Sequence, residues 1–317
     1  MFRKLSYVVF LVLILSSCTS TKQVLIPDWT SVPWGPFPLT CPDEIKNPVL
    51  KAADVSDRNA EFVADPFLFH ENDLWYLFFE VYDRKTDQGD IGLASSTDGL
   101  NWVYERIVLD ETFHLSYPYV FRYNGEYYMM PETHQLSDVR IYKAVHFPYA
   151  WKYQVTILNR RKYVDPSIFF YNNTWWLFVS DSNSTNLYLY YSHHLTRGWK
   201  EHPMSPIVKD DLSKARPGGR SLVYNENKII RFAEDKLTGA GVRAFEVDLL
   251  TPTQYREHEI PESPVIGPGN PPIEWFVANM HQYAPWWTGN DWLVAFDGLG
   301  PDGQFGIGIC ISKKPEP

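Results

Sequence analysis

Short runs of alternating bulky and polar residues recur along the chain, and tight polar turns join them in pairs. The first pair is Ala64–Phe69 and Trp75–Glu80, with His70-Glu71-Asn72-Asp73 between them. Alternation of this kind between turn residues predicts a half-buried β-hairpin. An acid stands near the start of the first run, and a second acid ends the next run.

The same hairpin pattern returns at regular intervals. In three copies the residue before proline and the end of the second run are 15 positions apart: 65 to 80, 117 to 132 and 165 to 180. Looser copies start at Arg216 and His281. The starts are separated by 52 (65 to 117), 48 (117 to 165), 51 (165 to 216) and 65 (216 to 281) residues. A four-stranded blade needs roughly 40–50 residues, so the repeats predict an all-β, five-bladed β-propeller over residues 55–317.

The first 18 residues lack this pattern and are expected to be a signal peptide. A basic start, Phe2-Arg3-Lys4, precedes an apolar run, 7–15, that is too short to span a bilayer. Leu15-Ser16-Ser17-Cys18 resembles a bacterial lipobox, in which Cys18 would carry the lipid; an ordinary cleaved signal is the alternative. We therefore expect a membrane-anchored lipoprotein of the bacterial cell envelope, on the periplasmic or outer-membrane face, with residues 19–54 as tether and lead-in.

Composition narrows the classes of partner. The formal net charge of −9 argues against nucleic acid, because phosphate binding requires a basic surface. Aromatic residues make up 16% of the chain, which suits packing between blades and stacking on sugar rings. Cys41 and Cys310 flank the repeats, and a bond between them would join the ends of the ring; two unpaired thiols are the alternative. We expect a monomer.

Acidic residues recur at equivalent positions in the repeated hairpins. A propeller would therefore bring them together at one end of its central axis. Asp65 and Asp165 open their runs before a proline, while Glu132 and Glu234 end second runs, as Glu80 and Asp297 also do. Solvated acids at strand ends are the plain alternative. We interpret four of these residues as catalytic: Asp65, Asp165, Glu132 and Glu234.

A second group of residues is expected to bind substrate. Arg216 occupies the position in its hairpin that Asp65 and Asp165 occupy in theirs. Its planar guanidinium group, like that of Arg220, suits an anionic or hydroxylated ligand. Structural ion pairing is the alternative for both. His114, Tyr117 and His281 are expected to face the axis, although a single histidine is usually only hydrogen-bonded. No metal ligand set is assigned and no cofactor is required, and a central structural cation stays open.

Several runs resemble known propellers. The Asp65-Pro66-Phe67 and Val164-Asp165-Pro166-Ser167 patterns resemble glycoside hydrolase family 43. A closer resemblance is to the N-terminal propeller of plant glucosamine inositolphosphorylceramide transferases, over about residues 60–312. It is carried by Ala64-Asp65-Pro66-Phe67, Phe113-His114-Leu115-Ser116-Tyr117-Pro118-Tyr119-Val120-Phe121, Met130-Pro131-Glu132-Thr133, Tyr163-Val164-Asp165-Pro166-Ser167 and Ala215-Arg216-Pro217-Gly218-Gly219-Arg220.

The family 43 resemblance implies roles for some residues. Asp65 would be the general base, and Asp165 would tune the pKa of the acid. The general acid would open blade four, where Arg216 stands instead, so Glu132 or Glu234 would have to take its role. Blade two of that family usually carries an Asp near Pro118, where this chain has Tyr119. In the plant transferases the transfer chemistry belongs to a separate C-terminal domain, so we expect none here.

Three functions compete on this evidence. The first is a carbohydrate-active glycoside hydrolase that works with an acid and a base carboxyl group. The second is a non-catalytic glycan-binding protein that uses the same aromatic-lined site with Arg216 and Arg220 as clamps. The third is an envelope scaffold, in which ion pairs with the arginines occupy the axial acids.

Overall fold

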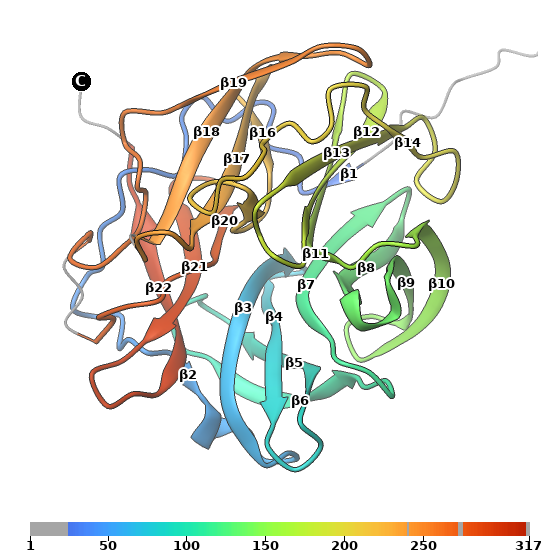
Figure 1. The fold of residues 1–317 in the computed structure, drawn as a ribbon. Coiled ribbons are helices and arrows are strands. Elements are labelled where there is room, and N and C mark those ends of the chain that lie inside the picture. The colour runs from blue at the N-terminus through green and yellow to red at the C-terminus, as the bar shows by residue number, and fades with distance from the viewer. Residues whose placement is uncertain (1–24, 240, 272–274, 315–317) are drawn as a thin grey trace, which may run out of the picture.

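Five antiparallel sheets surround a common centre in the computed structural model, which describes residues 25–239, 241–271 and 275–314 (Figure 1). The predicted all-β propeller is therefore confirmed. Cys18 and the expected signal peptide lie outside the described residues. Within the described ranges, the chain forms no helix with the length and apolar character needed to cross a membrane.

The first two blades follow the predicted hairpins. Blade one comprises β3 (Ala60–Glu71), β4 (Leu74–Asp83), β5 (Gln88–Ser96) and β6 (Val103–Leu109). Blade two comprises β7 (Ser116–Tyr123), β8 (Glu126–Glu132), β9 (Asp138–His146) and β10 (Ala150–Asn159), and the short strand β1 (Leu25–Ile26) pairs with β7.

The remaining blades are less regular. Blade three comprises β11 (Tyr163–Tyr171), β12 (Thr174–Asp181), β13 (Leu187–Ser192) and β14 (Lys200–Glu201). Blade four begins with the broken strands β15 (Arg216–Pro217) and β16 (Leu222–Tyr224), followed by β17 (Lys228–Asp235), β18 (Gly241–Leu250) and β19 (Tyr255–Glu259). Blade five comprises β20 (Tyr283–Trp287), β21 (Trp292–Leu299) and β22 (Phe305–Ser312). Two short 3₁₀ helices, η1 (Ala52–Asp54) and η2 (His134–Leu136), complete the elements.

Two-residue turns set the register of the first hairpins. Asn72 and Asp73 connect β3 to β4 with φ values of 54° and 59°. Asn172 and Asn173 connect β11 to β12 in the same way, with φ values of 49° and 55°. Positive φ at both central positions is the turn geometry that matches the twist of paired strands, and asparagine tolerates it well. In blade one the turn keeps Asp65 and Glu80, which lie at the open end of the hairpin, at the same end of the molecule.

The N-terminal part of the described chain closes the ring. The short strand β2 (Leu50–Lys51) pairs with β22 and supplies the fourth strand of blade five. Cys41 and Cys310 form a disulfide across a sequence separation of 269 residues, with 4.5 Å between their Cα atoms. Both links attach the segment that leads into blade one to the last blade, and β2 covers the edge of β22.

Residues 27–49 pack against blade five. Trp29 is buried, and its ring centroid lies 5.7 Å from that of Trp286 and 5.2 Å from that of Trp292. The indole nitrogen of Trp292 donates to the carbonyl oxygen of Trp34 at 3.0 Å. Although this part of the chain was expected to be a tether, the structure packs it onto the propeller.

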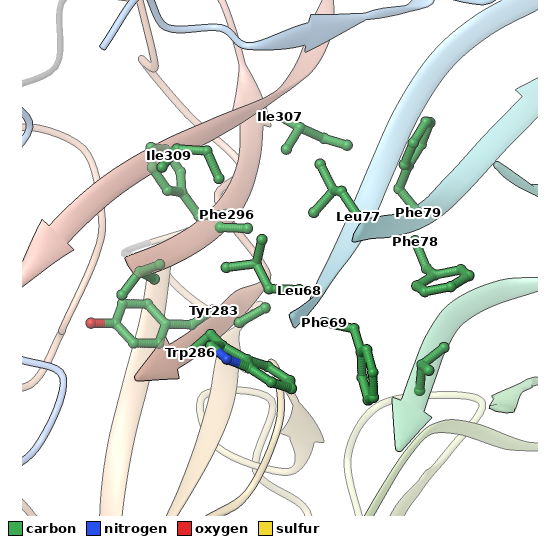
Figure 2. Packing of buried hydrophobic residues seen from close by; sticks show 14 of the residues in the cluster. Leu68, Phe69, Leu77, Phe78, Phe79, Tyr283, Trp286, Phe296, Ile307 and Ile309 are labelled. Atoms are coloured by element: carbon green, nitrogen blue, oxygen red, sulfur yellow. The ribbon is translucent and has the colours of Figure 1, made fainter. Parts of the chain in front are cut away.

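Aromatic and branched side chains fill the space between blades one and five. Leu68 and Phe69 from β3 and Leu77 from β4 lie toward the side chains of the last sheet, whereas Phe78 points the other way, against Phe147 and Trp151 of blade two (Figure 2). The opposing residues are Tyr283, Trp286, Phe296, Ile307 and Ile309. This core fixes the innermost strands, whose starts carry the candidate site.

Candidate active site at one end of the propeller axis

A β-bulge interrupts the innermost strand at the same point in the first three blades. The ladder shifts between Ala64 and Phe67 in blade one, and equivalent shifts occur in blades two and three. The bulged residues have positive φ: 53° at Asp65, 49° at Tyr117 and 51° at Asp165. This region is sparsely populated by residues other than glycine and carries backbone strain, which is often found at functional sites. The bulge also redirects these side chains from regular alternation.

Five buried carboxyl groups gather at this end, and we call them the axial cluster. Their exposed fractions run from 0 to 6%, and the members are Asp65, Glu80, Glu132, Asp165 and Asp297. They come from blades one, two, three and five. The structure therefore brings together three of the four predicted catalytic residues and adds two acids of equivalent phase. The fourth, Glu234 of blade four, is partly exposed at its edge.

The acids bind the backbone of the following blade. Asp297 of blade five accepts a hydrogen bond from the backbone N–H of Asp65 at 2.8 Å. Asp65 accepts one from Tyr117 at 3.2 Å, and Glu132 accepts one from Asp165 at 3.1 Å. Each carboxylate therefore holds the bulge of the next innermost strand. Such bonds compensate for part of the cost of burying negative charge.

His281 lies between two acids of the axial cluster. Its Nε2 is 3.1 Å from Asp65 Oδ1, and its Nδ1 is 3.2 Å from Asp297 Oδ1. Burial disfavours the charged ring, but the adjacent carboxylates of Asp297 and Asp65 outweigh it and raise the pKa of His281 well above its usual value. Both ring nitrogens face carboxylate oxygens, which favours the charged form of the ring.

The same three residues are the described group with metal-ligand character, since their ligand atoms lie within 4.8 Å of one another. Asp297 Oδ1 also accepts the backbone N–H groups of His281 at 3.1 Å and Gln282 at 3.0 Å. The donor set therefore fits an internal ion pair better than a cation site.

Glu80 is a member of the axial cluster whose pKa is strongly raised. Burial, followed by the charges of Asp65 and Glu132, raises its pKa well above the usual value of a carboxyl group. His114 Nδ1 accepts the backbone N–H of Gly89 at 2.9 Å, so in the neutral ring Nε2 carries the proton and faces Glu80 at 3.4 Å. Burial lowers the pKa of His114, which favours the neutral ring. The shift favours the protonated form of Glu80, and burial raises the pKa values of Asp165 and Asp297 as well.

The pKa of Glu132 is shifted in the opposite direction. Burial alone would raise its pKa, but the hydrogen bond from His134 and the charge of Arg216 lower the pKa to about 2. His134 Nδ1 lies 2.5 Å from Glu132 Oε1. Glu132 is consequently ionised at any pH at which the protein would work. Two carboxyl groups in one cluster with pKa values pushed apart are typical of an acid–base site.

Arg216 neutralises the blade-three side of the cluster. Its Nε donates to Asp165 Oδ2 and lies 3.3 Å from Glu234 Oε2, while Lys236 Nζ lies 3.9 Å from the same oxygen. Burial raises the pKa of Asp165, although the guanidinium opposes this shift. The scaffold interpretation predicted such an ion pair, and it accounts for Asp165 and Glu234 only. Asp65 and Glu80 face histidines instead.

Two residues expected to bind substrate lie beneath the cluster. Arg220 is fully buried and donates to the carbonyl oxygens of Val120 at 3.0 Å and Leu68 at 3.2 Å. The hydroxyl of Tyr117 donates to the carbonyl oxygen of Gly219 at 2.8 Å. These bonds tie blade four to blades one and two across the axis. At this depth both side chains hold strands together, in contrast to the expected clamp roles.

Sequence reasoning undervalued three residues of the site. Glu80 and Asp297 were noted only as acids at equivalent positions, and no role was assigned to His134. Their partners come from other blades or from the next turn, so the pattern along the sequence does not reveal these pairs. The available signal was the recurrence of acids at one position of the repeat, because Glu80 and Asp297 end second strands as Glu132 does.

The fold is a five-bladed β-propeller, and solved structures of glycoside hydrolases share it. A glycosyl hydrolase structure from Bacteroides ovatus superposes with a TM-score of 0.64 at 13% identity, covering 91% of this chain and 98% of that one. The catalytic domain of a Coprinopsis cinerea GH62 α-L-arabinofuranosidase gives 0.63 at 12% identity, covering 81% and 92%. At such low identity these likenesses show the fold alone.

The family of the chain follows from sequence comparison. The model described as "Glucosamine inositolphosphorylceramide transferase 1, N-terminal" matches residues 40–298, so the chain belongs to this family. Proteins named glucosamine inositolphosphorylceramide transferase 1 are 38% identical over 241 residues in Arabidopsis thaliana and over 225 residues in japonica rice. The matches cover 72% and 67% of this chain, and 30% of each relative.

The expected location is corrected by these relatives. We predicted a bacterial cell envelope from the N-terminal pattern. The curated relatives are plant proteins, which points to a eukaryotic and not a bacterial origin and contradicts that prediction. The N-terminal pattern misled because it rests on a few small and apolar residues before Cys18, and these carry little information.

Proposed function

We propose that the protein is a carbohydrate-active propeller that hydrolyses glycosidic bonds at the axial cluster. The observation that carries the proposal is the contrast between Glu80, whose pKa is raised well above its usual value by burial, and Glu132, whose pKa is lowered to about 2 in the same cluster. Glycoside hydrolysis requires one carboxyl group that donates a proton and one carboxylate that activates water. A cluster of several carboxyl groups with divergent pKa values suits both roles.

Asp65 is our candidate for the general base. His281 and the backbone N–H of Tyr117 each hold one of its oxygens, so its orientation is fixed. Glu80 is our candidate for the general acid, and it takes the role that the sequence left to Glu132 or Glu234. Glu132 is a poor proton donor because it is ionised, and Glu234 is bound to Arg216 and Lys236.

The comparisons support carbohydrate as the ligand class. The solved structures of similar fold are glycoside hydrolases, and the curated relatives are named for a glycosylated inositolphosphorylceramide. The chain spans about a third of those relatives, so we propose no transferase activity for it. A glycan is the feature that both groups of names share.

Non-catalytic glycan binding is the second candidate, and one observation favours it. Arg216 stands where family 43 propellers place their general acid, and it is bonded to Asp165. A guanidinium in this position suits recognition of hydroxyl or anionic groups. In that case the cluster would bind sugar without turnover.

The test is hydrolysis by the full chain of aryl furanosides, aryl pyranosides, polysaccharides and glycosylated inositolphosphorylceramide, with binding measured in parallel. Changing Asp65→Asn or Glu80→Gln is expected to reduce kcat by about 10²-fold or more, a typical contribution of a general acid or base. Glu105→Gln on the outer strand β6 is the matched control and should retain activity.

The pH profile separates the role of Glu80 from simple damage. A general acid works in its protonated form, so wild-type activity should fall as pH rises through the raised pKa of Glu80. In Glu80→Gln this alkaline limb should disappear. Binding without turnover by wild type for every glycan would leave the binding function and refute the hydrolase.

A further inference from the structure

An open groove runs along the outer strand of blade four, and we call it the lateral groove. Two adjacent pockets of about 320 and 480 Å³ form it, and Asp211, Lys214 and Glu257 line both of them. One wall is β19, the last strand of its sheet, and the other wall is the segment 204–214 between blades three and four (Figure 1). Volumes of this size are typical of sites that bind small molecules.

Two acids of the groove are bonded to neighbouring arginines. The carboxylate oxygens of Glu257 accept hydrogen bonds from Nε and Nη2 of Arg231, each at 2.6 Å, and the guanidinium of Arg231 is buried behind the groove. Glu259 accepts from Arg243 Nε at 2.8 Å and also from Arg243 Nη2. Bidentate pairs of this kind use up the acceptors of both carboxylates. A ligand in the groove would therefore meet little free negative charge.

The other cations of the groove keep donors for a ligand. Lys209 is exposed, and in the described ranges it has no ion-pair partner. Lys214 is 40% exposed, and its Nζ lies 3.4 Å from Asp211 Oδ2, which leaves further N–H groups of the ammonium available. Arg256 is 69% exposed. Four lysine and arginine side chains line the groove against three carboxylates, in a chain whose formal net charge is −9.

The wall of the groove also reaches the edge of the candidate site. Lys236 donates its backbone N–H to the carbonyl oxygen of Leu212, within the wall segment, at 3.0 Å. The Nζ of Lys236 lies 3.9 Å from Glu234 Oε2, and Arg216 of the axial site lies 3.3 Å from the same oxygen. The groove and the proposed carbohydrate site therefore share one structural border.

We propose that the lateral groove is a second binding site, which takes an anionic glycan through carboxylate or phosphate groups on its sugars. These groups would accept hydrogen bonds from Lys209, Lys214 and Arg256, because charge-assisted bonds are the strong ones. Pro206 and Ile207, which are half-buried in the wall, would contact the C–H groups of the sugars. The choice of a glycan rests on the proposed function, whereas the preference for an anion rests on the groove itself.

The test is isothermal titration calorimetry with the full chain. The probes are trigalacturonate, mannose 6-phosphate and inorganic phosphate, with maltotriose as the uncharged sugar. The double variant Lys209→Met/Lys214→Met removes two charges and keeps the aliphatic stems, while Lys214→Arg keeps the charge. Lys228→Met is the matched control, because Lys228 is a 44% exposed lysine of the same blade that pairs with Glu246 at 3.1 Å outside the groove. Thermal unfolding checks that each variant is folded.

Trigalacturonate or mannose 6-phosphate should bind at least about tenfold more tightly than maltotriose, and the difference should shrink at high salt, which screens exposed charges. The double variant should weaken the charged sugar by about tenfold, as expected for the loss of two exposed charge contacts. Lys214→Arg and Lys228→Met should bind like the wild type.

Three results would overturn the proposal: equal affinity for maltotriose, unchanged binding by the double variant, or no binding of either charged sugar. Inorganic phosphate that binds as tightly as the charged sugars would overturn the glycan as ligand. Hydrolysis is measured separately with Asp65→Asn and Glu80→Gln. A protein without turnover that still binds a charged sugar in the groove would refute the hydrolase and support the second site.

Discussion

Arg220 offers a sharp test of how the propeller is held together at its axis. It extends from blade four and donates to Leu68 of blade one and Val120 of blade two. Its guanidinium also lies 4.4 Å from the ring of Tyr119 and 5.8 Å from that of Trp286 in blade five. One side chain thus contacts three other blades. We expect Arg220→Met to destabilise the fold.

The expected loss of unfolding free energy follows from the two carbonyl groups that lose their hydrogen-bond donor. Each hydrogen bond from a charged donor contributes about 1.5–3 kcal/mol, so losing the two carbonyl bonds costs about 3–6 kcal/mol. The buried guanidinium has no carboxylate partner in the described structure, and burial lowers its pKa, so removing the charge returns part of this loss. Methionine fills most of the volume. The net expectation is a loss of about 2–4 kcal/mol in the free energy of unfolding.

Urea unfolding followed by tryptophan fluorescence measures this loss. Arg256→Met is the matched control, because Arg256 is 69% exposed and pairs with Asp248 at 3.5 Å. Surface ion pairs of this kind contribute about 0–1 kcal/mol. An Arg220→Met protein as stable as the control would refute the reasoning. It would mean that the desolvation of the charge cancels its bonds, as happens for some buried ion pairs.

Two further predictions concern the closure of the ring and the space around Glu80. Reducing the Cys41–Cys310 disulfide should lower the free energy of unfolding by about 2–4 kcal/mol, since the bond closes a loop of 269 residues; equal urea midpoints with and without reductant would contradict this. In Gly89→Ala the new Cβ would lie 2.4 Å from the carbonyl oxygen of Leu115 and 2.7 Å from Glu80 Oε1. The variant should lose turnover and melt at a lower temperature, and unchanged kcat with an unchanged Tm would show that the space beside Glu80 is not tight.

The sequence predicted the fold well because its repeats are periodic. Two features depend only on local geometry and can be read from the sequence. They are the turn pairs, such as Asn172-Asn173, and the fixed spacing from Asp165 to the end of the next strand. The phase of Asp65 and Asp165 predicted their meeting at one end of the axis. Blade five was found only through its weak hairpin, and its fourth strand came from Leu50–Lys51, where two residues carry no pattern.

The sequence could not predict which acid holds the proton. That property depends on burial and on charges contributed by other blades. Glu80 and Glu132 have the same phase, yet the pKa of one is raised and that of the other is lowered to about 2. The difference arises because His134 and Arg216 act on Glu132, whereas a neutral His114 faces Glu80. None of these pairings follows from spacing along the chain.

Charge balance links the burial of the cluster to its chemistry. The buried carboxyl groups outnumber the two cations beside them, His281 and Arg216, and the charges of Asp65 and Glu132 repel a negative charge on Glu80. The backbone N–H groups of the following blades offset part of the negative charge of the cluster. A proton on Glu80 relieves this repulsion. In the proposed reaction, the same repulsion would favour uptake of a new proton from water after Glu80 has given its own proton to the leaving group.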